Sequence, residues 1–345
     1  MDKAYENMTQ LILISGNDPN HSEMLAKAVA THNQSSTLID ITGEAELRSA
    51  SNFSCVEELN RRWPDLKQKV APWLNLLKLE YLLSQQPPLL PGLEDCLRAL
   101  FLIDQIKENM NNTIILLMPQ PAQAQRFLMG IINTPELIEQ IYNPLITRAE
   151  QLKEKLNSLE ALFNFKIPQN ISQLMPANLN SKLKEVSELL QDPSKCECYL
   201  HATNEKMAKK DITQFNLCGI QVKKLWLNYS LTSEELIKIN QELSPSTILH
   251  ANSSNEFESK KDIWLSEQLA SETPVIFTED QEGNSIASIL LPCLDKKQLN
   301  VQRCGNKLQL SIGCLRRTYP LPSLFNELSP CGARLVDRRL EVRFR

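Results

Sequence analysis

The residue types best suited to chemistry in this chain are its nine cysteines and four histidines. Cys196 and Cys198 form a C-x-C pair, but no second close pair accompanies them. A structural zinc site requires four thiolate or imidazole ligands at set spacings, usually with a C-x-x-C pair. The odd number of cysteines in a chain of 345 residues favours reduced thiols packed as small hydrophobic side chains. We therefore expect no metal ion.

The histidines stand in no spacing typical of a catalytic site, and the chain has no G-x-S-x-G nucleophile elbow. We expect each of them to be solvated or to cap a helix or turn: His21, His32, His201 and His250. The sequence thus offers no candidate catalytic residue.

A third candidate is the loop that follows the first predicted strand. Residues 11–15 form a short apolar run, Gly16 begins a turn, and residues 21–32 have helical spacing with Asn20 or Ser22 as the cap. Loops between a strand and a helix bind phosphate when glycines let the backbone N–H groups approach the ligand. The chain has only 9 glycines, whereas an average composition would give roughly 24, so intact nucleotide motifs are not expected.

The elements that must position this loop alternate between strands and helices. A second strand is predicted at residues 37–41, and helical sequence separates the later ones: residues 113–118, 198–202, 224–228 and 247–250. Residues 57–83 are strongly helical, with breaks near Pro64 and Pro72, and residues 93–109 form another helix. This alternation predicts an α/β fold with a mostly parallel sheet.

Residues 135–190 contain no strand signal and indicate a helical block, an insertion at about residues 121–192. Its apolar residues recur at helical spacing, which is typical of a stripe that faces the core. The alternative is an apolar groove for a helical client protein. In that case the candidate client-facing residues are Met129, Leu137, Ile141, Leu145 and Met175.

After Pro274 the hydrophobic period changes from 3.6 to 2, which predicts short strands in a β-sandwich. The predicted strands are residues 275–277, 286–291, 299–302, 308–312, 317–321 and 340–344. We place the domain boundary so that residues 1–273 form the α/β domain and residues 274–345 the sandwich.

The net charge of −4 is unevenly distributed. Residues 285–345 carry 11 Lys+Arg and 4 Asp+Glu, a net of +7, so the other 284 residues carry −11. A basic face that docks on the acidic domain is the simplest interpretation, and we expect no nucleic-acid partner because aromatic residues are few there. No apolar run is long enough to span a membrane and the polar first ten residues lack a signal sequence, so a cytoplasmic protein is expected.

The C-terminal residues carry a distinctive series of motifs over about 55 positions. These are LLPCLDKKQL at 290–299, GNKLQLSIG at 305–313, RRTYPLP at 316–322, GARL at 332–335 and RLEVRF at 339–344. The series resembles the small-heat-shock-protein (α-crystallin) module, in the version that is fused behind ArsA-type ATPases.

The remaining residues are similar to the ArsA and tail-anchored-protein-targeting ATPases. The similarity follows the strand-turn-helix at 11–32, the helix at 62–83, LPGLED at 90–95, RFL at 126–128, and Asn228 at a strand end. It implies a P-loop NTPase fold, a chaperone or targeting role, use of ATP and magnesium, and a dimer of two facing nucleotide domains. It also implies that Asn228 stands where the family contacts adenine.

The loop departs from the family's G-K-G-G-V-G-K-T pattern, since residues 16–23 read GNDPNHSE. By resemblance, Asn17 stands at the intersubunit lysine, Ser22 at the phosphate-binding lysine and Glu23 at the magnesium-holding hydroxyl. Together with Gly16 and Asn228, these residues form our expected vestigial nucleotide site. Residues 116–121, LLMPQP, likewise replace the family's D-x-A-P-T-G and offer no carboxylate for magnesium.

The physical consequences of these departures oppose nucleotide binding. Pro19 has no N–H to donate, and Asp18 and Glu23 place negative charge where phosphate would lie. A helix dipole contributes only about 0.3–1 kcal/mol, whereas a lost charge-assisted hydrogen bond costs roughly 1.5–3 kcal/mol.

Three functions remain open at this point. The first is a non-hydrolysing protein that binds a client or partner, with no bound cofactor expected. The second is a working ATPase with an unusual loop, which would use ATP and magnesium. The third is a regulatory subunit that pairs with an active paralogue instead of forming a homodimer.

Overall fold

The structure is a computed structural model. It describes residues 9–33, 35–44, 50–76, 78, 81, 92–109, 112–151, 178–243, 247–268, 272–280, 283–325 and 327–345. The chain forms two compact units. The first comprises Met1–Asn52, Glu108–Met129 and Glu188–Arg345, and the second comprises Phe53–Lys107 and Gly130–Ser187.

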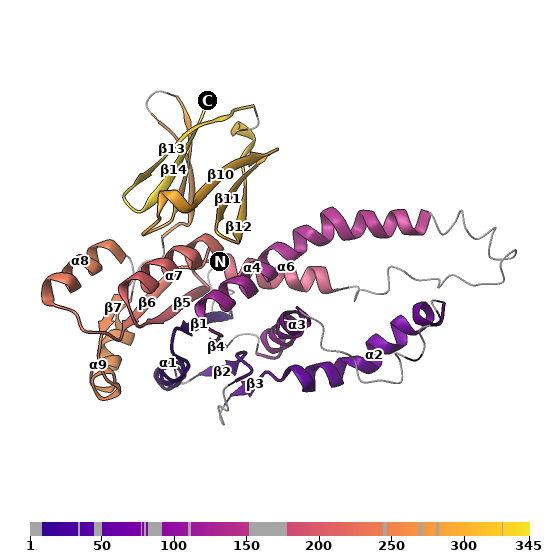
Figure 1. The fold of residues 1–345 in the computed structure, drawn as a ribbon, viewed down its shortest axis with the longest axis horizontal. Coiled ribbons are helices and arrows are strands. Elements are labelled where there is room, and N and C mark those ends of the chain that lie inside the picture. Colours follow the sequence, from indigo (N-terminus) through magenta and orange to yellow (C-terminus); the bar gives the residue numbers. More distant parts are fainter. Residues whose placement is uncertain are drawn as a thin grey trace, which may run out of the picture. The chain divides into compact units, whose positions relative to one another are not determined.

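A seven-stranded parallel sheet forms the centre of the first unit (Figure 1), which confirms the predicted fold class. The spatial order is β3-β2-β4-β1-β5-β6-β7. The bounds are β1 Gln10–Gly16, β2 Ser36–Asp40, β3 Ser51–Asn52, β4 Thr113–Leu117, β5 Cys196–Ala202, β6 Val222–Leu227 and β7 Thr247–His250. The central strands are fully buried apolar runs, as expected for a parallel sheet covered on both faces.

Helices cover both faces of this sheet. The bounds are α1 Pro19–His32, α7 Glu205–Cys218, α8 Ser233–Leu243 and α9 Ser254–Ser266. Figure 1 shows α7 on the face opposite α1 and α9, and α1 and α9 also contact each other. On their face, the rings of Trp226 and Phe257 stack with centroids 4.1 Å apart at the centre of an apolar cluster.

The start of α1 corrects our expectation of its cap. Neither Asn20 nor Ser22 caps the helix. Asp18, with extended backbone, precedes it and accepts a hydrogen bond from the His21 amide. The reason is Pro19, whose fixed φ and missing N–H suit the first helical position, so the helix begins two residues earlier than its apolar spacing indicates.

The second unit contains α2 (Cys55–Leu76) and α3 (Leu93–Glu108). We expected Pro64 and Pro72 to break α2, but the helix continues through both. Each proline deprives the carbonyl four residues earlier of its donor. Those residues, Asn60 and Gln68, are exposed, so water can hydrate the free carbonyls.

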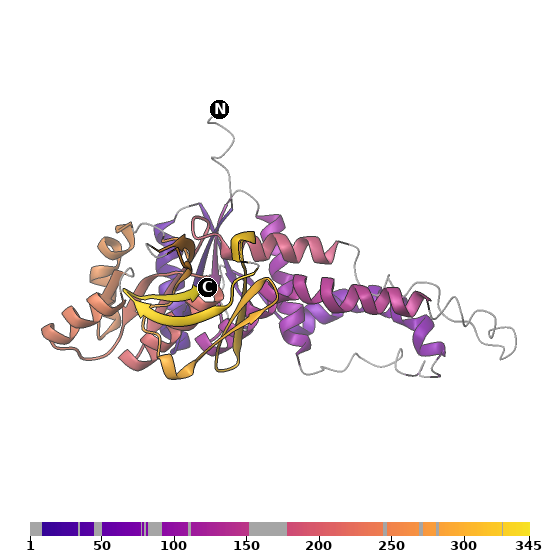
Figure 2. The same ribbon diagram turned by 90° about the horizontal axis from the view of Figure 1, so that it is seen from above.

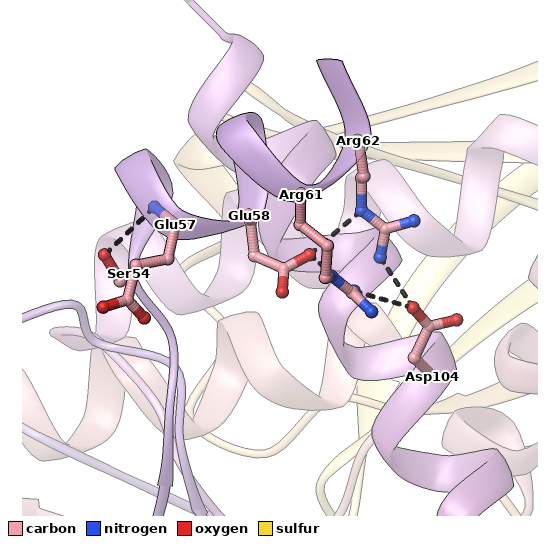
Figure 3. Close-up of polar contacts among 6 residues, drawn as sticks. All are labelled: Ser54, Glu57, Glu58, Arg61, Arg62 and Asp104. Atoms are coloured by element: carbon pink, nitrogen blue, oxygen red, sulfur yellow. Dashed lines mark hydrogen bonds and ion pairs between the residues drawn. The ribbon is translucent and has the colours of Figure 1, made fainter. Parts of the chain in front are cut away.

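A network of four charged side chains joins α2 to α3 (Figure 3). Arg61 and Arg62 both bind the Asp104 carboxylate, at 2.9 and 2.7 Å. Both also bind Glu58, which is buried, at 2.7 and 3.0 Å. The two arginines therefore lie between two carboxylates and fix the crossing of the helices.

Other helical segments belong to the predicted helical block. They are α4 (Pro121–Leu137), a π-helical turn at Ile138–Tyr142, a helix at 143–151, and α6 (Leu179–Gln191). As predicted, no strand occurs in the described part of residues 135–190. In the part of the chain that the structure describes, no helix combines the length and apolar character needed to cross a bilayer.

The C-terminal part of the first unit, hereafter the β domain, consists of two antiparallel sheets (Figure 2). One has the order β10-β11-β12 and the other β13-β14-β9-β8. The bounds are β8 Val275–Glu279, β9 Ser285–Leu290, β10 Leu299–Cys304, β11 Lys307–Ile312, β12 Leu315–Pro320, β13 Pro330–Val336 and β14 Arg339–Phe344.

Six of these strands were predicted and one was not. Strand β13 is largely exposed along its length and therefore lacks the apolar alternation by which the others were found. It pairs with β14, in which Leu340, Val342 and Phe344 alternate into the core.

Candidate functional site

A cavity of about 280 Å³ lies where β1 and β4 end and α1 begins. Ligands of parallel α/β proteins bind at this edge of the sheet, beyond the carboxyl ends of the strands. The lining residues are Gly16, Pro19, Asn20, Ser22, Glu23, Thr42, Glu44, Leu117, Met118, Pro119, Gln120 and Gln123. Of the five predicted site residues, Gly16, Ser22 and Glu23 line this cavity, whereas Asn17 and Asn228 are not among its lining residues.

The N-terminus of α1 uses its own residues as hydrogen-bond partners. The Asp18 carboxylate accepts from the His21 amide at 3.1 Å, and the Asp18 carbonyl accepts from both the amide and the hydroxyl of Ser22, at 3.0 and 2.9 Å. Partial burial acts to raise the pKa of Asp18, but the bond from the His21 amide and the nearby imidazole outweigh it and hold this pKa below its ordinary value. The carboxylate is therefore ionised at neutral pH, next to the helix dipole.

The side chains that line the cavity include two carboxylates and neither lysine nor arginine. Glu23 binds Lys27 one helical turn later, at 2.5 Å, and the Lys27 side chain is 56% exposed. Glu44 is also exposed. The charged groups that line the cavity are thus negative, and Lys27, the cation paired with Glu23, is not among the lining residues.

The second loop of the site follows β4. The Ser15 hydroxyl donates to the Pro119 carbonyl at 2.7 Å, and the Met118 amide donates to the Ile14 carbonyl at 2.8 Å. These bonds tie the loop to the end of β1. Gln120 of the loop and Gln123 of α4 are the glutamine side chains that line the cavity there. Amide side chains can orient a water molecule or a polar ligand, but they supply no charge.

His201 corrects the expectation that every histidine is solvated or caps an element. It lies at the end of β5, is 0% exposed, and stacks on His21 and against Trp226 with ring centroids 4.8 Å away in both cases. Neither ring nitrogen has a hydrogen-bond partner among the described residues. Burial, followed by the nearby His21, lowers the pKa of His201 to about 3, so the ring is neutral at physiological pH.

The neighbours of His21 and His201 explain two of the predicted site residues, Gly16 and Asn228. A Cβ added at Gly16 would lie 2.5 Å from Ser22 Oγ and 2.7 Å from His201 Cβ, so the close approach requires glycine. The Asn228 amide nitrogen lies 3.0 Å from His21 Nε2. Asn228 therefore holds the first turn of α1 in this structure.

Asn17 belongs to a separate buried polar group. Its amide donates to the carboxylate of Asp211 on α7 at 3.4 Å, and the Gln125 amide lies 3.5 Å from the Asp211 carbonyl. Burial raises the pKa of Asp211 to about 6, although bonds from Asn17 and Gln125 act to lower it. Sequence reasoning missed Asp211, which follows two lysines in a polar stretch and therefore gives no signal. It named His201 but did not expect its burial, although the apolar residues Tyr199 and Leu200 precede it.

The cysteine pair lies inside the sheet. Cys196 and Cys198 are both buried on β5, and burial raises the pKa of both thiols well above the ordinary range. They pack as thiols, and the described residues contain no group of three or more ligands that could hold a metal ion.

The predicted client-facing residues fall into three groups. Leu137, Ile141 and Leu145 recur every four residues and are 55%, 52% and 62% exposed. Met129 is 5% exposed and packs inside its unit, so it offers no surface to a client. Met175 lies outside the described residues.

Comparison with known proteins identifies two families along the chain. Residues 282–344 match the HSP20-like domain found in ArsA. A curated relative, an uncharacterized protein of Streptomyces coelicolor, is 37% identical over 73 residues, which span 21% of this chain and 19% of the relative. Residues 4–258 match the anion-transporting ATPases. The chain therefore belongs to the anion-transporting (ArsA) ATPase family and carries the HSP20-like domain of that family.

Proposed function

We propose that this chain is a family member that binds a client or partner protein and does not hydrolyse ATP. The observation that carries the proposal is the internal cap of α1. At the position where a nucleotide phosphate would meet the helix N-terminus, the Asp18 carboxylate already accepts the His21 amide and contributes its own negative charge.

The residues around the cavity do not fit a magnesium-bound triphosphate. Pro19 has no N–H, the Ser22 hydroxyl donates to the chain itself, and the charged side chains that line the cavity are Glu23 and Glu44. The loop after β4 offers Gln120 in place of a carboxylate for magnesium. A phosphate group would meet repulsion where an active site provides lysine, and this repulsion disfavours both the binding of ATP and its hydrolysis.

The client-binding part of the proposal depends on the exposed row formed by Leu137, Ile141 and Leu145. Single exposed apolar side chains are common on protein surfaces, but here three follow one another at intervals of four residues, from the end of α4 through the π-helical turn to the next helix. Such a row suits an amphipathic or apolar helix of another protein.

Titration of the full-length protein with a fluorescent ATP analogue and magnesium tests the nucleotide part. We expect no saturable binding below about 1 mM. The variant Asp18→Asn keeps the helix cap but removes its negative charge, so it should bind the ATP analogue no more weakly than the unmodified protein does. Glu57→Gln, on α2, is the control for the change in net charge. Micromolar, magnesium-dependent binding by the unmodified protein, or phosphate release from ATP, would overturn the proposal.

Binding of a labelled apolar helical peptide tests the client part. Replacing Leu137, Ile141 and Leu145 together by serine should weaken binding by about tenfold or more, because an apolar contact surface is lost. The matched control replaces three other exposed apolar residues by serine, Ile237, Ile263 and Leu324, which are 60%, 73% and 59% exposed. Equal losses in both triple variants would contradict a specific client surface.

A further inference from the structure

Helix α7 is buried on the side that faces the parallel sheet and also on a second side. From residue 211 to residue 218 every side chain except Gln214 is buried, although this stretch makes more than two helical turns. Strands β5 and β6 cover one side of α7, and strand β12 of the β domain contacts it as well. The buried residues include the polar Asp211, Thr213 and Asn216, which on a surface helix would face water.

Arg317 of β12 is the main contact of the β domain with this helix. Its position in the strand alternation makes it face inward with Leu315 and Tyr319, and it is 7% exposed. The guanidinium donates to the carbonyl of Leu217, in the last turn of α7, at 3.3 Å and to the side chain of Gln191 at 2.7 Å. It also lies over the Tyr319 ring, 4.9 Å from the centroid.

A glycine at the C-terminus of α7 leaves the space that the Arg317 guanidinium occupies. Gly219 ends the helix with a φ of 85°, and its amide bonds back to Asn216 and Phe215. A Cβ added there would lie 2.0 Å from the Arg317 guanidinium. A cation at the C-terminal end of a helix is also favoured by the helix dipole.

Two further contacts join the β domain to the helices α7 and α8. The Thr213 hydroxyl lies 2.6 Å from the carbonyl of Pro292, at the start of the segment after β9, and 2.8 Å from the Lys209 carbonyl of its own helix, so these two acceptors share its single hydrogen. The Cys293 thiol lies 3.6 Å from the Glu242 carbonyl at the end of α8. The β domain is thus attached through a buried charge and a buried hydrogen bond, not through exposed ion pairs alone.

The same helix reaches the loop after β1. Asp211 precedes Thr213 by two residues and accepts from the Asn17 side chain, and the Asn17 amide donates to the His201 carbonyl at 3.2 Å. We propose that the β domain acts as a clasp on α7, meaning that its docking through Arg317 and Thr213 keeps this helix in position. The docked helix holds Asp211 against Asn17 and so fixes the loop after β1. Opening the clasp frees α7 and loosens the loop, and by reciprocity a displaced loop weakens docking.

Hydrogen exchange of the full-length protein, measured by mass spectrometry without nucleotide, tests this proposal. The variant Arg317→Met keeps an unbranched stem but loses the guanidinium, and Arg316→Met, on the exposed side of the same strand, is its control. We expect exchange at residues 212–219 and at the Asn17 amide to become about tenfold faster in Arg317→Met only. Strands β9, β11 and β14 should keep their protection.

Unchanged exchange in either α7 or the loop would overturn the clasp. If the strands of the β domain also lose protection, Thr213→Val decides the question. It removes the bond to Pro292 from the α7 side, together with the contact to the Lys209 carbonyl within α7, and leaves the β domain's own residues intact, so exchange at Asn17 is the decisive readout. That variant should accelerate exchange in α7 and at Asn17, and its failure to do so would refute the coupling. Because no nucleotide is present, the outcome is independent of the proposed function.

Discussion

Two buried titratable residues near the loop after β1 respond to pH in opposite directions. Burial favours the neutral form of any titratable group, which lowers the pKa of a histidine and raises that of an aspartate. His201 has a pKa of about 3 and Asp211 a pKa of about 6. His201 therefore lowers the free energy of unfolding in acid, where the unfolded chain takes up its proton. Asp211 lowers it at neutral pH, where the unfolded chain releases its proton more readily.

The variant His201→Phe should remove an acid-dependent loss of stability. Below the ordinary histidine value of 6.5 the unfolded chain binds a proton that the folded chain does not bind until pH falls to about 3. The free energy of unfolding therefore decreases by about 2 kcal/mol between pH 7 and pH 5 from this residue. Urea unfolding at both pH values should show a smaller decrease in the variant, which also keeps an aromatic ring packed against His21 and Trp226. His32→Gln, at an exposed site, should leave the decrease unchanged.

The variant Asp211→Asn should act in the other direction. The folded chain holds a proton on Asp211 up to about pH 6, whereas the unfolded chain releases it near 3.8. Stability contributed by the protonated group is therefore lost as the pH rises from about 4 to 6, and asparagine avoids that loss. We expect the free energy of unfolding at pH 7 to increase by about 1–3 kcal/mol, with little change at pH 4. An equal change at both pH values would show that titration is not the cause.

At the scale of elements, helices α2 and α3 are joined by a network of ion pairs in which two arginines share two carboxylates. Glu58 and Asp104 lie on opposite sides of two arginines, so each cation has two partners (Figure 3). Partial burial acts to raise the pKa of Asp104, but hydrogen bonds from Arg61 and Arg62 keep it below its ordinary value. Networks of this kind contribute more than isolated surface pairs because each side chain is ordered once for several contacts.

The variant Asp104→Asn should destabilise this helix pair by about 1–2 kcal/mol at pH 7, because two arginines lose their shared carboxylate. Asp65→Asn, an exposed carboxylate of the same α2 helix, is the matched control and should change stability by less than about 0.5 kcal/mol. Thermal unfolding followed by circular dichroism measures both. Because the Asp104 pKa is depressed, its contribution is present above pH 4 and is lost as the pH falls through the folded value, so the two variants should converge in acid.

At the scale of the whole molecule, the charge asymmetry of the sequence does not explain how the β domain is attached. The net charge of +7 over residues 285–345 suggested docking on an acidic surface. The buried cation of this contact, Arg317, binds the Leu217 carbonyl of α7 and the side-chain amide of Gln191 of α6, not a carboxylate. Charge-assisted bonds to helix carbonyls give a specific joint without the cost of burying a second charge.

Two glycines with positive φ distinguish two contributions to stability. One is the free-energy cost of a left-handed backbone in a residue with a side chain, and the other is the cost of a steric clash with Arg317. Gly219 has a φ of 85° and faces the Arg317 guanidinium, whereas Gly313, in the turn between β11 and β12, has a φ of 60° and no heavy atom within 4 Å of an added Cβ. Gly313→Ala should destabilise the protein by about 1 kcal/mol, the cost of a left-handed alanine. Gly219→Ala should cost at least about 1 kcal/mol more, because Arg317 must also move. Equal losses in denaturant unfolding would show that the arginine adapts freely.

Local patterns predicted the elements well where burial is periodic. The apolar runs of β1 and β4 and the alternation in β11 and β14 gave their strands directly. Strand β13 was not predicted because an exposed strand has no such pattern. The breaks expected in α2 do not occur, because its two prolines are tolerated on an exposed face. The loop residues Gly16, Ser22 and Glu23 were found because a strand, a turn and a helix are adjacent in the sequence.

The sequence alone determined the alternation of strands and helices apart from β3 and β13, the family, and the residue types at the loop after β1. Only the tertiary structure decided what those residues touch: that Asp18 caps α1, that His201 lies buried beneath Gly16, and that Asp211 and Arg317 meet the loop and the end of α7. Periodicity reports which face of an element is apolar. It cannot report which distant element supplies a hydrogen bond, because such contacts join residues that are up to about 200 positions apart, as Asn17 and Asp211 are.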